Sequence, residues 1–133
     1  APPTNYAPLL QPLLAKFNAG TSSKVRKGNA VFGIAHITGG GFTGNIPRIL
    51  PDSVDVEIET SVWDPLPIFK LIAEKGEIDF DEMYEVFNMG IGMTLVVDRN
   101  QASEIIDFCK AQGCDALVVG KAVKGSGKVT LKR

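Results

Sequence analysis

Residues 36–48 have the sequence His-Ile-Thr-Gly-Gly-Gly-Phe-Thr-Gly-Asn-Ile-Pro-Arg, and they say more about the fold than any other part of the chain. They continue an apolar run, 31–37, that predicts a buried strand. Three glycines then predict a loop in which backbone can come close to another group. Residues 45–50 predict a short helix that ends at Pro51. Because amides at a helix start favour a negative group, this strand, loop and helix predict a phosphate site.

A glycine run is also typical of a plain turn, so composition alone leaves both interpretations open. The position of the glycines directly after a strand favours the anion site. Arg48 favours it too, because a guanidinium group is a good partner for phosphate.

The same stretch, together with Leu50-Pro51, closely resembles the signature of the phosphoribosylformylglycinamidine cyclo-ligases, also called aminoimidazole ribonucleotide synthetases. Further segments match the family from about Tyr6 to Val123: Trp63, Pro67-Ile68-Phe69, Met83-Tyr84, Phe87-Asn88 and Gly90-Ile91-Gly92-Met93. Two positions differ from the family pattern. Gly44 stands where an acidic residue is expected, and Met89 stands where a cysteine is expected.

The resemblance implies an α/β (α+β) fold in which a mixed β-sheet has helices packed on it. It implies a ligase of de novo purine biosynthesis that closes formylglycinamidine ribonucleotide to aminoimidazole ribonucleotide while ATP becomes ADP and phosphate. ATP and Mg²⁺ are then held mainly by an N-terminal ATP-binding domain that this sequence lacks. We therefore expect residues 1–133 to be a single domain, the C-terminal domain of a longer enzyme, and to be inactive alone.

The partners that the resemblance implies are a small ribonucleotide substrate, the N-terminal domain of the same enzyme and, for the full-length enzyme, a second copy in a homodimer. The site residues that we predict are His36 as a catalytic group, with Thr38, Gly39, Gly40, Gly41, Thr43, Asn45 and Arg48 binding substrate or phosphate. Three of these have a structural alternative. His36 could be satisfied by backbone, Asn45 could cap the short helix, and Arg48 could pair with a carboxylate.

Two other functions stay open at this point. Formylglycinamidine ribonucleotide synthetase, selenophosphate synthetase, thiamine-monophosphate kinase and a hydrogenase maturation protein share the architecture and use ATP, although Asn-Ile-Pro-Arg and Phe-Asn-x-Gly-Ile-Gly-Met favour the cyclo-ligase. A non-catalytic anion-binding or assembly module would belong to another class.

Composition narrows the partners. The formal net charge is −1, so the chain has no basic surplus for a nucleic-acid backbone. No stretch is long and apolar enough for a membrane span. The basic residues Lys24, Arg26 and Lys27 form either a solvated connector or an anion-facing cluster. We expect Cys109 and Cys114 to be reduced structural thiols, which favours the cytoplasm.

We predict no metal site. The single histidine, His36, is far in sequence from both cysteines. The acidic residues of 79–85 are typical of a solvated helix start, where Asp79 caps and Glu82 follows three residues later.

Further elements follow from periodicity. Helices are predicted over 6–17, 67–75, 79–87 and 101–112, with Gly76 and Gly113 ending the second and the last. Strands are predicted over 31–37, in a central position, and over 54–58, 93–97 and 116–119. Residues 129–131 are predicted to pair with 116–119 through a hairpin turn within 120–128. The spacing there does not fit a nucleotide-binding P-loop.

Overall fold

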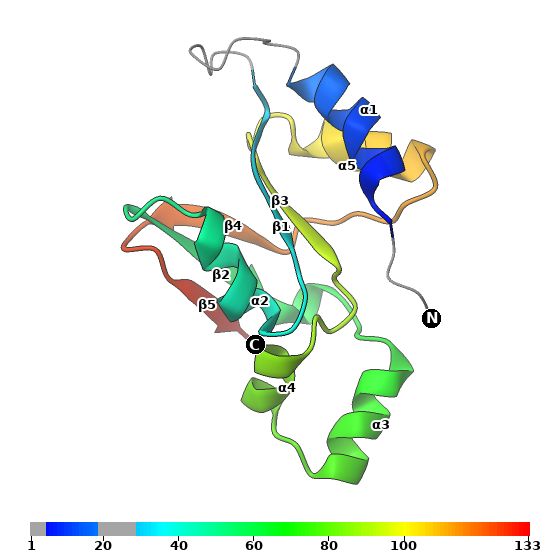
Figure 1. Cartoon of the computed structure of the whole chain (residues 1–133), viewed down its shortest axis with the longest axis vertical. Helices are drawn as coiled ribbons and strands as arrows, with labels where there is room; N and C mark the ends of the chain where they lie inside the picture. The colour runs from blue at the N-terminus through cyan, green and yellow to red at the C-terminus, as the bar shows by residue number, and fades with distance from the viewer. Residues whose placement is uncertain (1–4, 19–28) are drawn as a thin grey trace. The chain divides into compact units, whose positions relative to one another are not determined.

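The computed structural model of the chain describes residues 5–18 and 29–133 (Figure 1). The chain divides into two compact units. The first is drawn from residues 1–34 and 95–118, and the second from 35–94 and 119–133. Each unit has its own hydrophobic core. The α/β class with a mixed sheet is confirmed.

In the first unit, α1 (Ala7–Phe17) packs with α5 (Ala102–Ala111). Its core consists of Leu13, Phe17, Ala30, Val31, Ile105 and Cys109. The side chain of Asn18 accepts hydrogen bonds from the amides of Ala30 and Val31 and donates to the Val31 carbonyl. This amide therefore fixes the end of α1 to the following strand. Both cysteines are free thiols, and that of Cys109 is buried.

Two strands pass through both units and pair with each other: β1 (Val31–His36) and β3 (Met93–Val97). We predicted a central place for β1 because it is apolar on both faces. That prediction is wrong for the described residues, where β1 has β3 as its only strand neighbour. Phe32 is 62% exposed, so one apolar position of β1 is not covered by a further strand.

The second unit contains a three-stranded sheet in the order β4-β2-β5, formed by β4 (Gly120–Lys124), β2 (Val54–Glu59) and β5 (Val129–Lys132). The central strand runs antiparallel to β4 and parallel to β5. The predicted strand over 116–119 and its hairpin with 129–131 are therefore wrong. The chain leaves β4, crosses the start of β2 and returns on its other side.

The alternation of apolar and acidic residues in β2 explains why this strand lies in the centre of the three-stranded sheet. Val56 and Ile58 are buried on one face, while Glu57 between them pairs with Lys121 of β4 at 3.7 Å and with Lys132 of β5 at 3.2 Å. One acidic residue thus meets a cation from each neighbouring strand. A hairpin between β4 and β5 would leave both the apolar pair and Glu57 without these partners.

The helices of the second unit are α2 (Gly41–Asn45), the 3₁₀ turns η1 (Ile46–Ile49) and η2 (Thr60–Val62), α3 (Pro67–Gly76) and α4 (Phe80–Val86). The short helix predicted over 45–50 begins earlier, at Gly41, and continues as a 3₁₀ turn. Asp79 caps α4 as predicted, because its carboxylate accepts from the Glu82 amide at 2.9 Å.

The end of α3 differs from the prediction in a specific way. The left-handed residue is Glu77, with φ of 51°, and Gly76 still belongs to the helix. A Cβ atom at Gly76 would lie 2.9 Å from Cδ1 of Ile78. A larger residue at position 76 would therefore make the Ile78 side chain shift, while the backbone angle there does not call for glycine. No helix in the described ranges is both long and apolar enough to cross a bilayer.

An aromatic cluster supports the region of residues 36–48. Phe42, which is 0% exposed, makes an edge contact with Trp63 and stacks with Tyr84. The indole Nε1 of Trp63 donates to the Met89 carbonyl at 3.1 Å. The first turn of α2 is thus held in the core by a large buried ring.

The crossing between β4 and β5 is held by one carboxylate. Asp55 accepts from the amide of Lys128 at 2.8 Å and from that of Ser126 at 2.7 Å. These N–H groups hold the pKa of Asp55 below its usual range. A carboxyl whose folded-state pKa is depressed contributes stability above its unfolded pKa of about 3.9, and that contribution is lost as pH falls through the folded value.

Substitution Asp55→Asn should lower the melting temperature at pH 7, because the neutral amide is a weaker acceptor for these N–H groups. Thermal unfolding at pH 7 and in increasingly acidic buffers, as pH falls through the lowered folded-state pKa of Asp55, measures the effect. The difference in melting temperature between wild type and Asp55→Asn should become smaller in acid. Asp52→Asn is the matched control, since that exposed carboxylate accepts no hydrogen bond from any described residue. A difference of equal size at pH 7 and in acid would contradict the assignment.

Candidate functional site: the glycine loop after β1

The loop 38–40 is anchored on both sides by buried residues. Before it, Ile37 is 1% exposed, and its amide donates to the Gly92 carbonyl at 2.9 Å. After it comes the buried ring of Phe42. The chain reverses between these anchors through Gly40, with φ of 98°, and Gly41, with φ of 59°. Side chains other than glycine rarely adopt such angles.

Gly41 also allows a close approach of backbone. A Cβ atom built there would lie 1.9 Å from the carbonyl oxygen of Tyr84 in α4. A Cβ atom at Gly39 would meet nothing within 4 Å. The glycines of one run therefore differ in role: Gly41 lets α2 pack on α4, and Gly39 faces open space.

The side chain of Asn45 holds the loop through hydrogen bonds. The residue is buried, with 4% of its surface exposed. The amide nitrogen donates to the carbonyls of Gly41 at 2.7 Å, Thr38 at 3.3 Å and Gly39 at 3.4 Å, and the amide oxygen accepts from the Thr38 hydroxyl at 3.1 Å. The proposed alternative, a helix cap, is wrong, because Asn45 ends α2 and makes no capping hydrogen bond to η1.

The direction of the loop carbonyls fixes the direction of its amides. In a trans peptide unit the C=O and the following N–H point in opposite directions, and the described residues contain no cis peptide bond. Because the carbonyls of Thr38, Gly39 and Gly41 face Asn45, the N–H groups of Gly39, Gly40 and Phe42 are directed away from it. None of these three N–H groups donates to a described residue.

The amide set differs from the predicted one in one member. The N–H of Gly41 donates to the Thr38 carbonyl at 3.0 Å, so the turn itself uses it. Phe42 supplies the third outward N–H group instead. The sequence pattern does not indicate Phe42, because a run of glycines points only to glycines as exposed backbone donors. The asparagine at position 45, four residues after Gly41, was the available signal.

Two of the remaining predicted residues, Thr43 and Arg48, follow the loop in the sequence. Thr43 and Arg48 are exposed, and their side chains make no hydrogen bond or ion pair with the described residues. The alternative that Arg48 pairs with a carboxylate is therefore not seen within residues 5–18 and 29–133. The basic residues Lys24, Arg26 and Lys27 lie outside the described residues.

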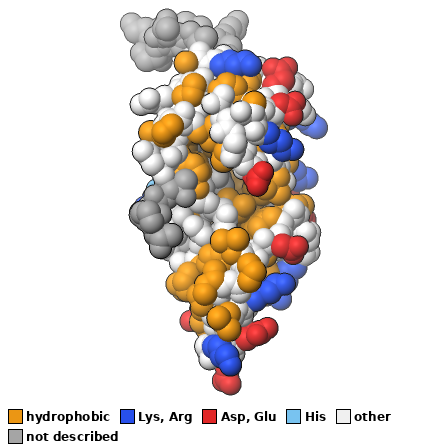
Figure 2. Space-filling view, turned by 90° about the vertical axis from the view of Figure 1, so that its right-hand side faces the viewer, with side chains coloured by type: hydrophobic (Ala, Val, Ile, Leu, Met, Phe, Trp, Pro, Cys, Tyr) orange, Lys and Arg blue, Asp and Glu red, His pale blue; other side chains and the backbone are white. Residues whose placement is uncertain are grey.

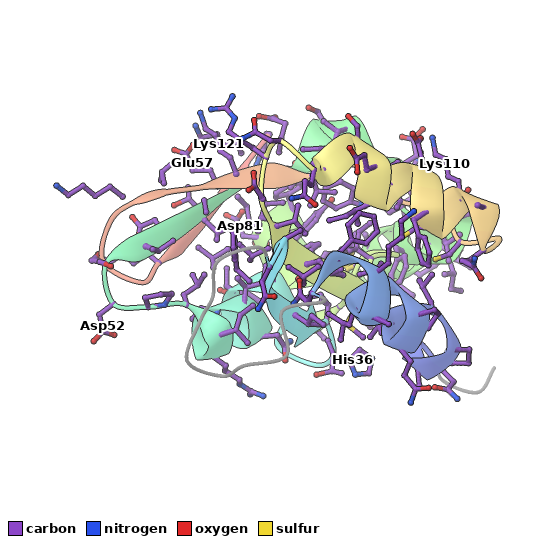
Figure 3. The ribbon with its side chains drawn as sticks, turned by 90° about the horizontal axis from the view of Figure 1, so that it is seen from above. His36, Asp52, Glu57, Asp81, Lys110 and Lys121 are labelled. Carbon is purple, nitrogen blue, oxygen red and sulfur yellow. The ribbon has the colours of Figure 1, made fainter. Side chains whose placement is uncertain are left out.

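His36 ends β1 and is exposed. Figure 3 shows its ring well apart from the labelled acidic side chains of Asp52, Glu57 and Asp81. The carboxylate of Asp81 accepts instead from the guanidinium of Arg133 at 3.0 Å. His36 therefore does not form a histidine–carboxylate pair with any of these three.

A separate hollow lies between α3 and α4. It has a volume of about 130 Å³ and is almost wholly apolar, and its lining is Pro65, Phe69, Lys70, Ala73, Ile78, Phe80, Met83, Tyr84 and Met89. Burial raises the pKa of Tyr84 above its usual value. Hydrophobic side chains gather over the lower part of the face shown in Figure 2. Leu66, Ile68 and Leu71 of the second unit are exposed large apolar residues. This hollow offers packing surface and not polar chemistry.

Comparison with known proteins identifies the family. The sequence model described as "AIR synthase related protein, C-terminal domain" matches residues 7–132. The chain belongs to this family. It is also similar to proteins named phosphoribosylformylglycinamidine cyclo-ligase from Bacillus thuringiensis subsp. konkukian, Bacillus mycoides and Bacillus cereus strain AH820. Each is 46% identical over 101 residues, which are 76% of this chain and 29% of the relative. The match thus spans less than a third of these relatives.

Substitutions of Gly39 and Gly41, the first and last glycines of the run, test their different roles. Gly41→Ala should destabilise the protein by about 3 kcal/mol, because it combines a left-handed backbone with a clash against the Tyr84 carbonyl. Gly39→Ala should change stability by less than about 0.5 kcal/mol, because its Cβ meets open space. Urea denaturation of both variants measures the difference. Equal stability of the two variants would show that α2 does not approach α4 as described.

Proposed function

We propose that this chain is the C-terminal domain of a phosphoribosylformylglycinamidine cyclo-ligase, the ligase of purine biosynthesis that closes formylglycinamidine ribonucleotide to aminoimidazole ribonucleotide with ATP. The observation that carries the proposal is the 46% identity over 101 residues to proteins of that name. The family match over 7–132 agrees with it. No observation favours another ATP-using enzyme of the superfamily or a non-catalytic module.

The glycine loop gives this domain a physical task. The outward N–H groups of Gly39 and Gly40 bind a phosphate group of the ribonucleotide. Thr43 contributes a hydroxyl and Arg48 a positive charge from the same region, while the Thr38 hydroxyl is used by Asn45. Ring closure requires two phosphate-bearing molecules to be held in register. Fixed N–H dipoles suit this task, because they need no reorganisation when charge develops on a transferred phosphoryl group. His36, at the end of β1, is the proposed proton donor.

Among residues 5–18 and 29–133, no three His, Cys, Asp or Glu side chains lie together as a group that could hold a metal ion. On the strength of the family resemblance, the proposal assigns ATP and Mg²⁺ mainly to an N-terminal domain of the longer enzyme. The same proposal includes a homodimer for that enzyme and a cytoplasmic location.

Binding to the chain itself tests the site. Titration with formylglycinamidine ribonucleotide, followed by ¹H–¹⁵N NMR, should shift the amide signals of Gly39 and Gly40, and the uncharged nucleoside should not. Arg48→Gln should weaken binding on the order of tenfold, the value of one charge-assisted hydrogen bond. Arg99→Gln, at another exposed arginine, is the control and should bind as wild type does. Shifts confined to other regions would show that the loop is not part of the site. Equal affinity of the two variants would show that Arg48 is not part of it.

Activity distinguishes the enzyme from a binding module. The corresponding segment of the Bacillus thuringiensis protein can be replaced by residues of this chain, and the folded chimera assayed for ATP-dependent imidazole formation. A cyclo-ligase domain should support ring closure. A chimera that folds and binds the ribonucleotide without closing the ring would favour the non-catalytic alternative.

A further inference from the structure

We propose that Asn45 is a positioning residue: it binds no ligand itself but turns the loop carbonyls inward, so that the N–H groups of Gly39 and Gly40 face the phosphate. This replaces the ligand-binding role that the sequence suggested for Asn45. Its consequence for binding rests on the proposed function, and its consequence for the loop does not.

The hydrogen-bonding capacity of Asn45 supports this role. A carboxamide has two N–H donors, and three loop carbonyls lie within 3.4 Å of the nitrogen. The shortest of these bonds, to Gly41, spans 2.7 Å. Because Asn45 is buried and both donors of its carboxamide are used, no side-chain N–H group remains for a ligand.

The orientation of the carboxamide is fixed by its surroundings. A rotation that exchanged nitrogen and oxygen would place the oxygen against carbonyl oxygens, which cannot donate. The Thr38 hydroxyl, 3.1 Å from Oδ1, donates from the other side. The two residues that enclose the glycines therefore hold each other in one arrangement.

The chemistry of Asn at this position is specific. Aspartate has the same shape but only accepts hydrogen bonds when ionised, so it would face several carbonyl oxygens without a donor. A left-handed turn through Gly40 and Gly41 has few conformational restraints of its own. Without the amide donors, the peptide units of the loop are free to rotate, and the N–H groups lose their common direction.

Asn45→Asp tests the role with two readouts in the same chain. In ¹⁵N relaxation without ligand, the order parameters of Gly39 and Gly40 should fall from about 0.85 toward about 0.6, while those of the three-stranded sheet stay rigid. Affinity for inorganic phosphate should fall on the order of tenfold, because a loop that is no longer preorganised must be ordered on binding. Gly44→Ala is the neighbouring control. Its Cβ meets nothing within 4 Å, and both readouts should match wild type.

Each result decides one question. A loop that stays rigid in Asn45→Asp overturns the positioning role, whether or not phosphate binding weakens. A loop that loosens without weaker binding shows that Asn45 does not act on the anion site. If wild type binds no phosphate, the proposed function fails at this loop, and the ligand-free relaxation alone decides the role of Asn45.

Thr38→Val keeps the test valid if Asn45→Asp does not fold. This substitution removes the hydroxyl that orients Oδ1 and leaves both donors of Asn45 in place. The order parameters of Gly39 and Gly40 should fall by less than in Asn45→Asp, with a loss of phosphate affinity of about two- to threefold. Weaker binding with an unchanged loop would assign Thr38 a direct contact and overturn the proposal.

Discussion

The second unit depends on how one buried carboxamide is satisfied. Asn45 lies at the end of a five-residue helix and donates back across the loop that precedes it. A buried polar group left without partners would cost about 1–3 kcal/mol, so the loop must supply acceptors. It does so by turning its carbonyls toward Asn45. The trans peptide geometry then directs the alternate N–H groups outward. The direction of the amides is thus a consequence of satisfying Asn45.

Packing beneath the loop makes this arrangement possible. Phe42 inserts into the aromatic cluster with Trp63 and Tyr84, and Gly41 beside it allows α2 to reach the backbone of α4. Any larger residue at 41 would move the helix away from this contact. The core therefore fixes the position of the loop, and Asn45 fixes its internal conformation. These are separate constraints, and each resides in a different residue.

Much of the fold was predictable from local pattern. The alternation in β2 and the cap at Asp79 are properties of neighbouring residues, and the structure has both. The crossing from β4 to β5 was not predictable in this way, because it depends on contacts of Asp55 and Glu57 with residues 64 to 75 positions away along the chain. Local sequence favours a hairpin between the last two strands. The structure lacks that hairpin because β4 and β5 each pair with a different edge of β2.

The candidate site shows the same division. The glycine run predicted a loop. The separate role of each glycine depends on which atoms lie near its Cα, and the spacing of residues in the sequence does not indicate that. Asn45 was identified as important, and its role followed only from the three carbonyls around it. The family resemblance named the activity and could not indicate which of these residues touches a ligand.

The most direct test of this account is a crystal structure of the chain with selenate, a phosphate-like anion whose selenium is located by anomalous scattering. The account predicts a selenium peak with its oxygens about 3 Å from the amide nitrogens of Gly39 and Gly40, while the carboxamide of Asn45 still faces the loop carbonyls. Loop amides that donate to protein groups, or an anion bound only elsewhere, would contradict it.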